Sequence, residues 1–328
     1  MRDVIFCHLL DSRRSCSIAG ELVVHNQIAK STFIRAGSLL CQSRRPIAGS
    51  ETPLNTPALL TCRHRTKQRT FMLPRVLVHA FKRPLPYTST WALQEKIHRL
   101  QLEQRRTGSH PDVLLLHEHR PTYTAGRRQT EPDIHDERVR LQTLGADFIT
   151  ATRGGQLTYH GPGQIVGYPL IDLSRYTPTM GAKDYVCRIQ NLLKFHLRDS
   201  HGIQSSSSEH TGVFLDPTTK IASIGVQVRH RLTSHGFAIN ITNEPLPWFD
   251  QIVACGLDDV AAGSIQSKLQ TPIQIQDEIP GLVAQFGSLF DREMVTMDLH
   301  EQGEIGQAIA ALEQEAEEAG SWPVEPKS

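Results

Sequence analysis

Two alternating segments late in the chain constrain its fold more than any other feature. Along residues 220–228, apolar side chains alternate with small or polar ones, and the same period of two returns along residues 235–241. Successive side chains of a β-strand point to opposite faces, so both segments are predicted to be strands. The polar stretch 229–234 between them is typical of a turn, and the whole region therefore predicts a β-hairpin.

One face of this hairpin is unusually small. Ile224, Phe237 and their alternate neighbours form an apolar face, whereas Gly225, Gly236 and Ala238 lie on the opposite face. Such residues leave space beside the backbone, which either a hydrocarbon chain or a closely packed neighbouring element could fill. The sequence leaves both explanations open.

The remaining periodicity predicts helices and further strands. A helix capped by Ser89 or Thr90 is expected to run to about Arg105, and Gly202 is expected to end a second helix over 182–199. Strands are expected near 75–78 and 113–116, and late helices near 278–290 and 304–318. Helices mixed with hairpin strands favour a single α+β domain, with a mixed sheet flanked by helices, over a doubly wound sheet.

The first part of the chain differs from the rest in charge. Residues 1–70 contain 11 Lys and Arg against 4 Asp and Glu, although the whole chain has a net charge of only +1. A basic segment rich in Arg, Ser and Thr, without an apolar period, is typical of an organelle transit peptide. We therefore predict a basic, disordered extension over 1–71 and a mitochondrial location. A disordered tail, or a true start at Met72, would explain the same composition.

The composition also excludes several classes of protein. No run of residues approaches the roughly 18 apolar residues that cross a bilayer, and no basic stripe outside the extension indicates nucleic-acid binding. Cys187 and Cys255 are the cysteines of residues 71–328, which is too few for a disulfide framework or a zinc knuckle. Residues 296–328 are strongly acidic and are expected to form a C-terminal helix and tail.

A glycine-rich segment over residues 153–164 is the strongest local indication of a binding site. Four glycines and a proline lie within twelve residues, RGGQLTYHGPGQ, together with the charged Arg153 and the titratable His160. The backbone of such a loop can approach a ligand closely, although many glycine-rich loops only connect strands. The segment fits neither common nucleotide-binding pattern of glycines.

Several segments together resemble one enzyme family. The segments RGGQLTYHGPGQIVGYPLIDL, TGVFLDPTTKIASIGVQV, SHGFAINI and ACGL resemble, in the same order, motifs of the lipoyl(octanoyl) transferase family. The earlier segment LLLHEHRPTYTAGRR is similar to the family's N-terminal strand and turn. The resemblance covers roughly residues 75–270, and implies a catalytic domain over 72–295 with a fold similar to biotin and lipoate protein ligases.

The resemblance also implies a set of site residues. Cys255 would accept the acyl group as nucleophile, and Lys220 would activate its thiol. No metal or other cofactor is implied. The residues expected to bind the acyl substrate are Arg153, Gly154, Gly155, Gln156, Leu157, Thr158, Tyr159, His160, Ser223, Ile224, Gly225, Gly236, Phe237 and Ala238.

Two positions depart from the family pattern. Ala254 precedes the cysteine where the family usually has proline, and Ala262, Gly263 and Ser264 replace a usual Val-Thr-Ser. The second change removes a hydroxyl near the expected site. These departures favour one alternative, a catalytically inactive protein that only binds lipoyl domains.

Elementary thiol chemistry agrees with the roles that the resemblance implies. A thiol with a pKa near ~8.5 is only slightly ionised at neutral pH, and a neighbouring ammonium group stabilises the reactive thiolate. Lys220 and Cys255 are 35 positions apart in the sequence, so only the fold can bring the two together. His160 and His235 each precede a glycine, and either could assist proton transfer or simply order its loop.

The resulting hypothesis is an acyltransferase of protein lipoylation. Octanoyl would pass from octanoyl-acyl carrier protein to Cys255, and then to a lysine of an apo lipoyl domain. Acceptors would include the glycine cleavage H protein and the E2 subunits of 2-oxoacid dehydrogenases. The main alternative is an ATP-dependent lipoate- or biotin-protein ligase, which shares the fold but activates the acid as an adenylate without a cysteine.

Overall fold

The computed structural model describes residues 73–327 except Thr130 and Asp258, and also leaves the side chains of Glu131, Asp133 and Cys255 undescribed. The basic extension expected over 1–71 therefore lies outside the described residues. Residues 71–328 belong to one compact unit.

A mixed sheet of eight strands runs through the described part of the chain. Its order is β10-β8-β9-β6-β2-β1-β11, and β7 pairs with the outer part of β8. Pairs such as β1 with β2 are parallel, whereas β2 with β6 and β6 with β9 are antiparallel, so the predicted mixed sheet is confirmed. The strands are β1 (Val76–Ala80), β2 (Asp112–His117), β6 (Gln164–Leu170), β7 (Val213–Asp216), β8 (Thr219–Arg229), β9 (Leu232–Asn240), β10 (Ala261–Ala262) and β11 (Met294–Thr296).

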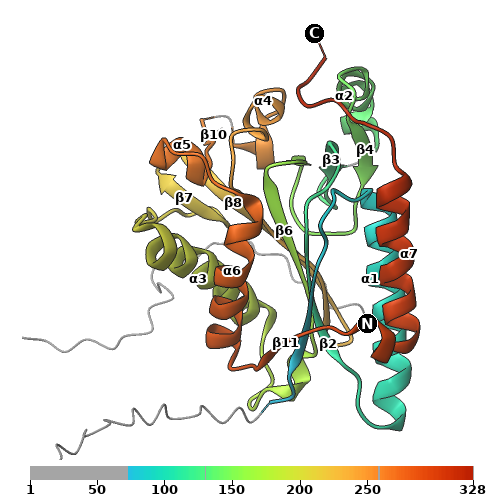
Figure 1. Ribbon diagram of the computed structural model, residues 1–328. Coiled ribbons are helices and arrows are strands. Elements are labelled where there is room, and N and C mark those ends of the chain that lie inside the picture. Colours follow the sequence, from blue (N-terminus) through green and yellow to red (C-terminus); the bar gives the residue numbers. More distant parts are fainter. Residues whose placement is uncertain (1–72, 130, 258, 328) are drawn as a thin grey trace, which may run out of the picture. The chain divides into compact units, whose positions relative to one another are not determined.

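Helices cover both faces of this sheet (Figure 1). Strand alternation divides β2, because Leu114 and Leu116 pack in a core with α3 and α6, whereas Val113 and Leu115 pack in a second core with α1 and α7. The helices are α1 (Tyr87–Thr107), α2 (Glu131–Thr143), α3 (Ala182–His201), α4 (Leu246–Phe249), α5 (Ile265–Leu269), α6 (Ile275–Phe290) and α7 (Gly303–Glu318), with short 3₁₀ turns η1 (Leu173–Arg175), η2 (Ala254–Gly256) and η3 (Leu299–Glu301).

The predicted hairpin is confirmed, and its turn is tighter than the sequence indicated. β8 and β9 pair antiparallel from Ala222 with Ile239 to Arg229 with Leu232, so that Gly225 lies opposite Gly236. Only His230 and Arg231 form the turn, with φ of 55° and 67°. Two consecutive residues with positive φ match the twist of a two-residue hairpin, although neither is the glycine or asparagine that usually signals one.

The helix ends show where local signals succeeded and failed. Gly202 ends α3 in the left-handed conformation with φ of 67°, as predicted. The predicted cap of α1 is wrong, because the helix begins at Tyr87 directly after Pro86. Thr90 lies inside the first turn, where its hydroxyl donates to the Tyr87 carbonyl. Pro86 makes no side-chain capping bond, and its ring fixes its own φ at the start of the helix.

A smaller sheet of order β4-β3-β5 lies at one end of the main sheet, beside α2 and α4 (Figure 1). It consists of β3 (Thr122–Ala125), β4 (Asp147–Thr150) and β5 (Thr158–His160). Its own apolar core contains Tyr159 stacked on Trp248, with ring centroids 5.3 Å apart. Leu157 and Tyr159 belong to this core, which therefore anchors the middle of the glycine-rich segment.

The C-terminal segment packs with the rest of the unit. The boundary expected at residue 295 falls inside β11, which pairs parallel with β1. Ile309 and Leu312 of α7 are buried in the same core as Leu93 of α1. Among the helices of the described residues, none has the length and apolar character needed to span a membrane.

Candidate active site

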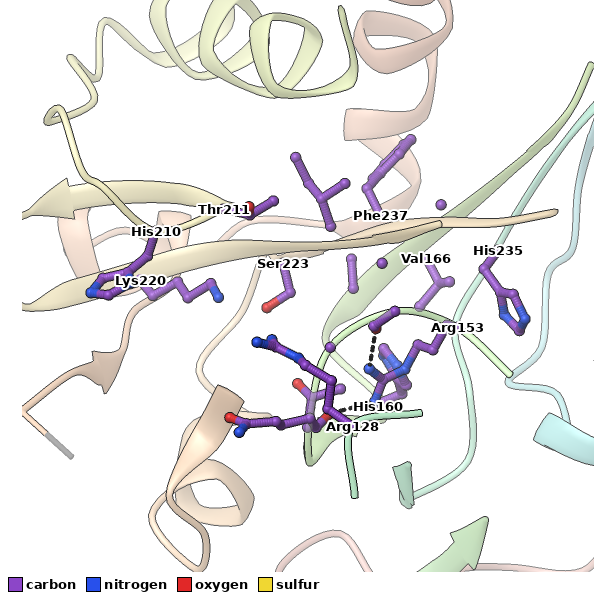
Figure 2. A pocket seen from close by; sticks show the side chains of 18 of the residues that line it. Arg128, Arg153, His160, Val166, His210, Thr211, Lys220, Ser223, His235 and Phe237 are labelled. Atoms are coloured by element: carbon purple, nitrogen blue, oxygen red, sulfur yellow. Dashed lines mark hydrogen bonds between the residues drawn. The ribbon is translucent and has the colours of Figure 1, made fainter. Parts of the chain in front are cut away.

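A cavity of about 460 Å³ lies between the β8–β9 hairpin and the glycine-rich segment. Figure 2 shows Lys220 and Ser223 from β8, His235 and Phe237 from β9, and Arg153 and His160 from the glycine-rich segment around it. Twelve of the fourteen residues expected to bind the acyl substrate line this cavity: Arg153, Gly154, Gly155, Gln156, Thr158, His160, Ser223, Ile224, Gly225, Gly236, Phe237 and Ala238.

The other two expected residues, Leu157 and Tyr159, do not line this cavity. Both are buried in the core of the small sheet, where Tyr159 is fully inaccessible. The reason is the alternation of β5, which turns Thr158 and His160 toward the cavity and their neighbours the opposite way. Over residues 157–160 the motif therefore alternates between side chains that pack in the core and side chains that line the cavity.

Arg153 organises the loop around it. Its guanidinium donates hydrogen bonds to the carbonyl oxygens of Thr124 at 2.6 Å, Gln156 at 3.0 Å and Gly154 at 3.0 Å. The residue is only 7% exposed. A buried cation shared among loop carbonyls fixes their geometry, so the shape of the cavity wall depends on this side chain.

The structure explains the small residues of the hairpin by close packing. A Cβ added at Gly225 would lie 3.2 Å from Cδ of Arg153 and 3.3 Å from the Gly154 oxygen. One added at Gly236 would lie 2.7 Å from Cδ of Pro169 and would overlap the Gly167 oxygen. Contact with neighbouring protein atoms therefore accounts for Gly236, whereas Gly225 is tightly packed and also lines the cavity. The cavity extends beside them.

Lys220 lies at the start of β8, where both β7 and β10 pair with this strand. Its side chain is 9% exposed, and its Nζ lies 5.7 Å from the ring centroid of Phe214 on β7. Gly212 makes room for it, because a Cβ at this residue (φ 135°) would lie 2.6 Å from the lysine Cε. β10 pairs with the same stretch of β8, Ala262 opposite Lys220, which fixes the lysine backbone.

The backbone of Cys255 lies in η2, and its side chain lies outside what the structure describes. Its neighbours mark its place: Gly256 and Leu257 line the cavity that Lys220 also lines. Gly256 adopts φ of 68°, and a side chain there would overlap that of Gln156. The cysteine segment therefore abuts the glycine-rich segment, and six residues later the chain pairs with β8 beside Lys220.

The segment that departs from the family pattern has a structural role. Ser264 is fully buried and caps α5, because its Oγ accepts from the Ser267 amide at 2.8 Å and donates to Oδ1 of Asn243 at 2.7 Å. Gly263 donates its amide to the Lys220 carbonyl at 2.9 Å. The segment thus supports the lysine strand without presenting a hydroxyl to the cavity described above.

Burial keeps two of the histidines that line the cavity, His160 and His235, uncharged at neutral pH. Burial lowers the pKa of His235 to about 3, and the nearby Arg153 adds to the effect. Burial also lowers the pKa of His160 well below its ordinary value, with His119 and Arg153 contributing. Nδ1 of His160 lies 2.7 Å from Oε1 of Gln164, to which it donates, so one ring nitrogen serves to order the loop.

Three comparisons place the chain among known proteins. The family model described as the lipoyl protein ligase A/B catalytic domain matches residues 86–287. The chain belongs to this family. An octanoyltransferase from Koribacter versatilis is 36% identical over 215 residues, covering 65% of this chain and 83% of the relative. A relative from Danio rerio named as a mitochondrial octanoyl-[acyl-carrier-protein]:protein N-octanoyltransferase is 37% identical over 198 residues, covering 60% and 86%.

A solved structure confirms the expected fold of this family. A lipoate-protein ligase A bound with ATP aligns with a TM-score of 0.51 and 15% identity, covering 77% of this chain and 99% of the ligase. At this level of identity the likeness is one of fold alone.

Sequence reasoning missed several residues that line the cavity of this family member. Tyr87 comes from the start of α1, and Tyr168 comes from β6, where its hydroxyl lies 2.8 Å from Nε2 of His119. The His119 Nδ1 donates to the Leu85 carbonyl at 3.1 Å, so its Nε2 accepts from the tyrosine. Arg128 and His210 line the cavity from two loops. Tyr168 and Arg128 had a signal, since both fall within segments that resemble the family's motifs.

Proposed function

We propose that this chain is an octanoyltransferase that carries the acyl group on Cys255. The observation that carries the proposal is the convergence of the cysteine segment and Lys220 on one cavity, formed by the motifs that resemble octanoyltransferases. The names of the two curated relatives support the same reaction.

The reaction would proceed in two acyl transfers. The Cys255 thiolate attacks the thioester carbonyl of octanoyl-acyl carrier protein, a new C–S bond forms, and the carrier sulfur leaves and takes a proton. The amine of a lysine on an apo lipoyl domain then attacks the octanoyl-cysteine, forming an amide and returning the thiol. A thiol nucleophile divides one difficult transfer into two easier ones, and the proposed reaction needs no nucleotide or metal.

Lys220 would serve the first step as a buried cation. Its ammonium stabilises the thiolate, and a lysine in a partly desolvated place can also hold and return a proton. The tight fit around Gly212 and the pairing with β10 restrict where the ammonium can lie. Such restriction is what a fixed lysine–cysteine pair requires.

The cavity wall offers an apolar surface for the acyl chain. Val166, Ile224 and Phe237 line it together with Ala238. Burial of each methylene contributes about 0.8 kcal/mol, so a medium-length chain gains several such increments. We propose that the twelve motif residues around the cavity form the acyl-binding site, with the apolar ones among them contacting the chain.

The finer assignments follow from the proposed reaction. We propose residues 72–295 as the catalytic domain, within which the family match falls. The donor would be octanoyl-acyl carrier protein, and the acceptors would be apo lipoyl domains of the glycine cleavage H protein and dehydrogenase E2 subunits. The basic extension and the name of the Danio rerio relative support a mitochondrial location.

Assaying transfer without nucleotide tests the proposal against its alternatives. The full chain is mixed with octanoyl-acyl carrier protein and an apo lipoyl domain, and octanoylated lipoyl domain is measured by mass. Product without ATP supports the transferase; product only from octanoic acid with ATP would establish a ligase. Cys255→Ala should abolish transfer and Cys187→Ala should retain it. Binding of the lipoyl domain without product under either condition would establish an inactive binding protein.

A further inference from the structure

Three side chains that can bind metals converge between α3 and α6. Nε2 of His196 lies 2.7 Å from Oε2 of Glu278, and Nε2 of His201 lies 2.8 Å from the same oxygen. One potential ligand atom from each residue lies within 4.8 Å of the other two. These residues are separate from those that line the cavity of the proposed active site.

The three groups are enclosed but reachable. The side chains of His196 and Glu278 are 1% and 6% exposed, whereas that of His201 is 12% exposed. The cluster therefore opens toward solvent on the His201 side. Two nitrogen ligands and one carboxylate oxygen, with an open position, form a common set for Zn²⁺ and related cations.

The donor atoms lie slightly closer together than the ligands of a bound cation do. At a metal–ligand length of roughly 2.0–2.1 Å, neighbouring ligand atoms of a tetrahedral site lie about 3.3 Å apart. The observed separations of 2.7 and 2.8 Å are those of hydrogen bonds. If the donor atoms moved apart by about half an ångström, one metal ion could replace the two hydrogen-bonding protons.

The surroundings also fit a metal site. Oγ of Ser200 lies 3.4 Å from Nδ1 of His196, so it can accept a hydrogen bond from Nδ1–H when Nε2 binds a cation. Gly281 permits this approach, since a Cβ there would lie 2.9 Å from Cε1 of His196 and 3.3 Å from the serine oxygen. Glu278 lies in the first turn of α6, where the helix dipole favours a carboxylate.

Both imidazoles face the one carboxylate, Nε2 of His196 at 2.7 Å and Nε2 of His201 at 2.8 Å from Oε2 of Glu278. A buried negative charge facing two imidazoles provides the electrostatic attraction that a divalent cation requires.

We propose that His196, His201 and Glu278 bind a divalent transition-metal cation of the Zn²⁺ class. The ion fastens the end of α3 to the start of α6, and a solvent molecule completes its coordination beside His201. The role is structural: α3 leads into the loop that carries His210 to the cavity, and Gln190 of α3 holds that loop by donating to the Gly212 carbonyl at 2.7 Å.

Zinc binding by the metal-stripped full chain tests this proposal. Wild-type protein, His201→Gln and the control His300→Gln are loaded with Zn²⁺ and desalted, and bound zinc is counted by elemental analysis. His300 is an exposed histidine of η3. Wild type and the control should retain one more zinc per chain than His201→Gln. Their melting temperatures should rise with Zn²⁺, because a ligand of the folded state stabilises it, and His201→Gln should lose this rise.

Two further measurements exclude other origins of the signal. Glu278→Gln, with its melting temperature measured without metal to establish that it folds, should lose the same zinc and the same rise. Co²⁺ bound to wild type should show visible bands of nitrogen and oxygen ligands that are lost in His201→Gln. Equal zinc content and equal melting shifts in wild type and His201→Gln would overturn the proposal. So would a Co²⁺ spectrum dominated by the thiolate band, since the chain has six cysteines.

Discussion

Replacing His235 by asparagine should make the fold less sensitive to acid. His235 adopts φ of 55°, and asparagine tolerates this left-handed conformation better than most residues. The backbone amide, which donates to Oε1 of Gln94 at 2.7 Å, is retained. The substitution therefore removes a titrating imidazole with little change to the strand that carries it.

The magnitude follows from the pKa of this imidazole in the two states. Burial, with a smaller effect of Arg153, lowers the pKa of His235 from 6.5 to about 3 in the folded protein. In the window between these two values the unfolded chain binds a proton that the folded protein does not. Lowering the pH through that window stabilises the unfolded state. Between about pH 7.5 and about pH 5 this one group removes about 2 kcal/mol from the free energy of unfolding.

Urea unfolding at both pH values, for wild type and His235→Asn, measures this contribution. The wild type should lose about 2 kcal/mol more stability on acidification than the variant. Subtracting the variant's loss of stability from that of the wild type removes the contribution of groups that titrate alike in both proteins. One such group is the buried His119, whose pKa burial lowers to about 4. Equal losses in the two proteins would refute the assignment of His235 as a buried, neutral imidazole.

Gly225→Val should lower the melting temperature, since overpacking against Arg153 typically costs about 1–3 kcal/mol. Gly154→Ala should not, because its added carbon would meet only one backbone oxygen at 3.8 Å; equal melting temperatures of the two variants would contradict the packing account. Tyr159→Ala should destabilise by about 3–5 kcal/mol in urea unfolding because its ring is fully buried, and a loss below about 1 kcal/mol would count against a core role. Lys220→Ala should slow alkylation of the reactive thiol at neutral pH, and an arginine at that position should restore alkylation without turnover; an unchanged alkylation rate would exclude electrostatic activation.

Local patterns predicted the elements that depend on local physics. The apolar faces of β8 and β9 and the apolar stripe of α3 pack in the same core, and the sequence records such apolar faces directly. Gly202 ended α3 as expected because the left-handed conformation strongly favours glycine. The motif residues from 153 to 160 gathered at one cavity, apart from the two that β5 turns into the core.

Features made by contacts between distant segments could not be predicted in the same way. Gly225 looked equally suited to a ligand or to packing, and only the fold shows that Arg153 packs close to it beside the cavity. Tyr87 reaches the cavity from a helix whose pattern indicates nothing beyond an apolar face. Likewise His201 and Glu278, which are 77 positions apart in the sequence, meet only because α3 packs against α6.

An intact-mass measurement tests the central claim most directly. The full chain is mixed with octanoyl-acyl carrier protein in the absence of an acceptor, quenched in acid and weighed by mass spectrometry. The proposed mechanism predicts a gain of one octanoyl group, lost on treatment with hydroxylamine, present in Cys187→Ala and absent in Cys255→Ala. Octanoyl transfer to lipoyl domains with no such adduct, or an adduct that persists in Cys255→Ala, would contradict it.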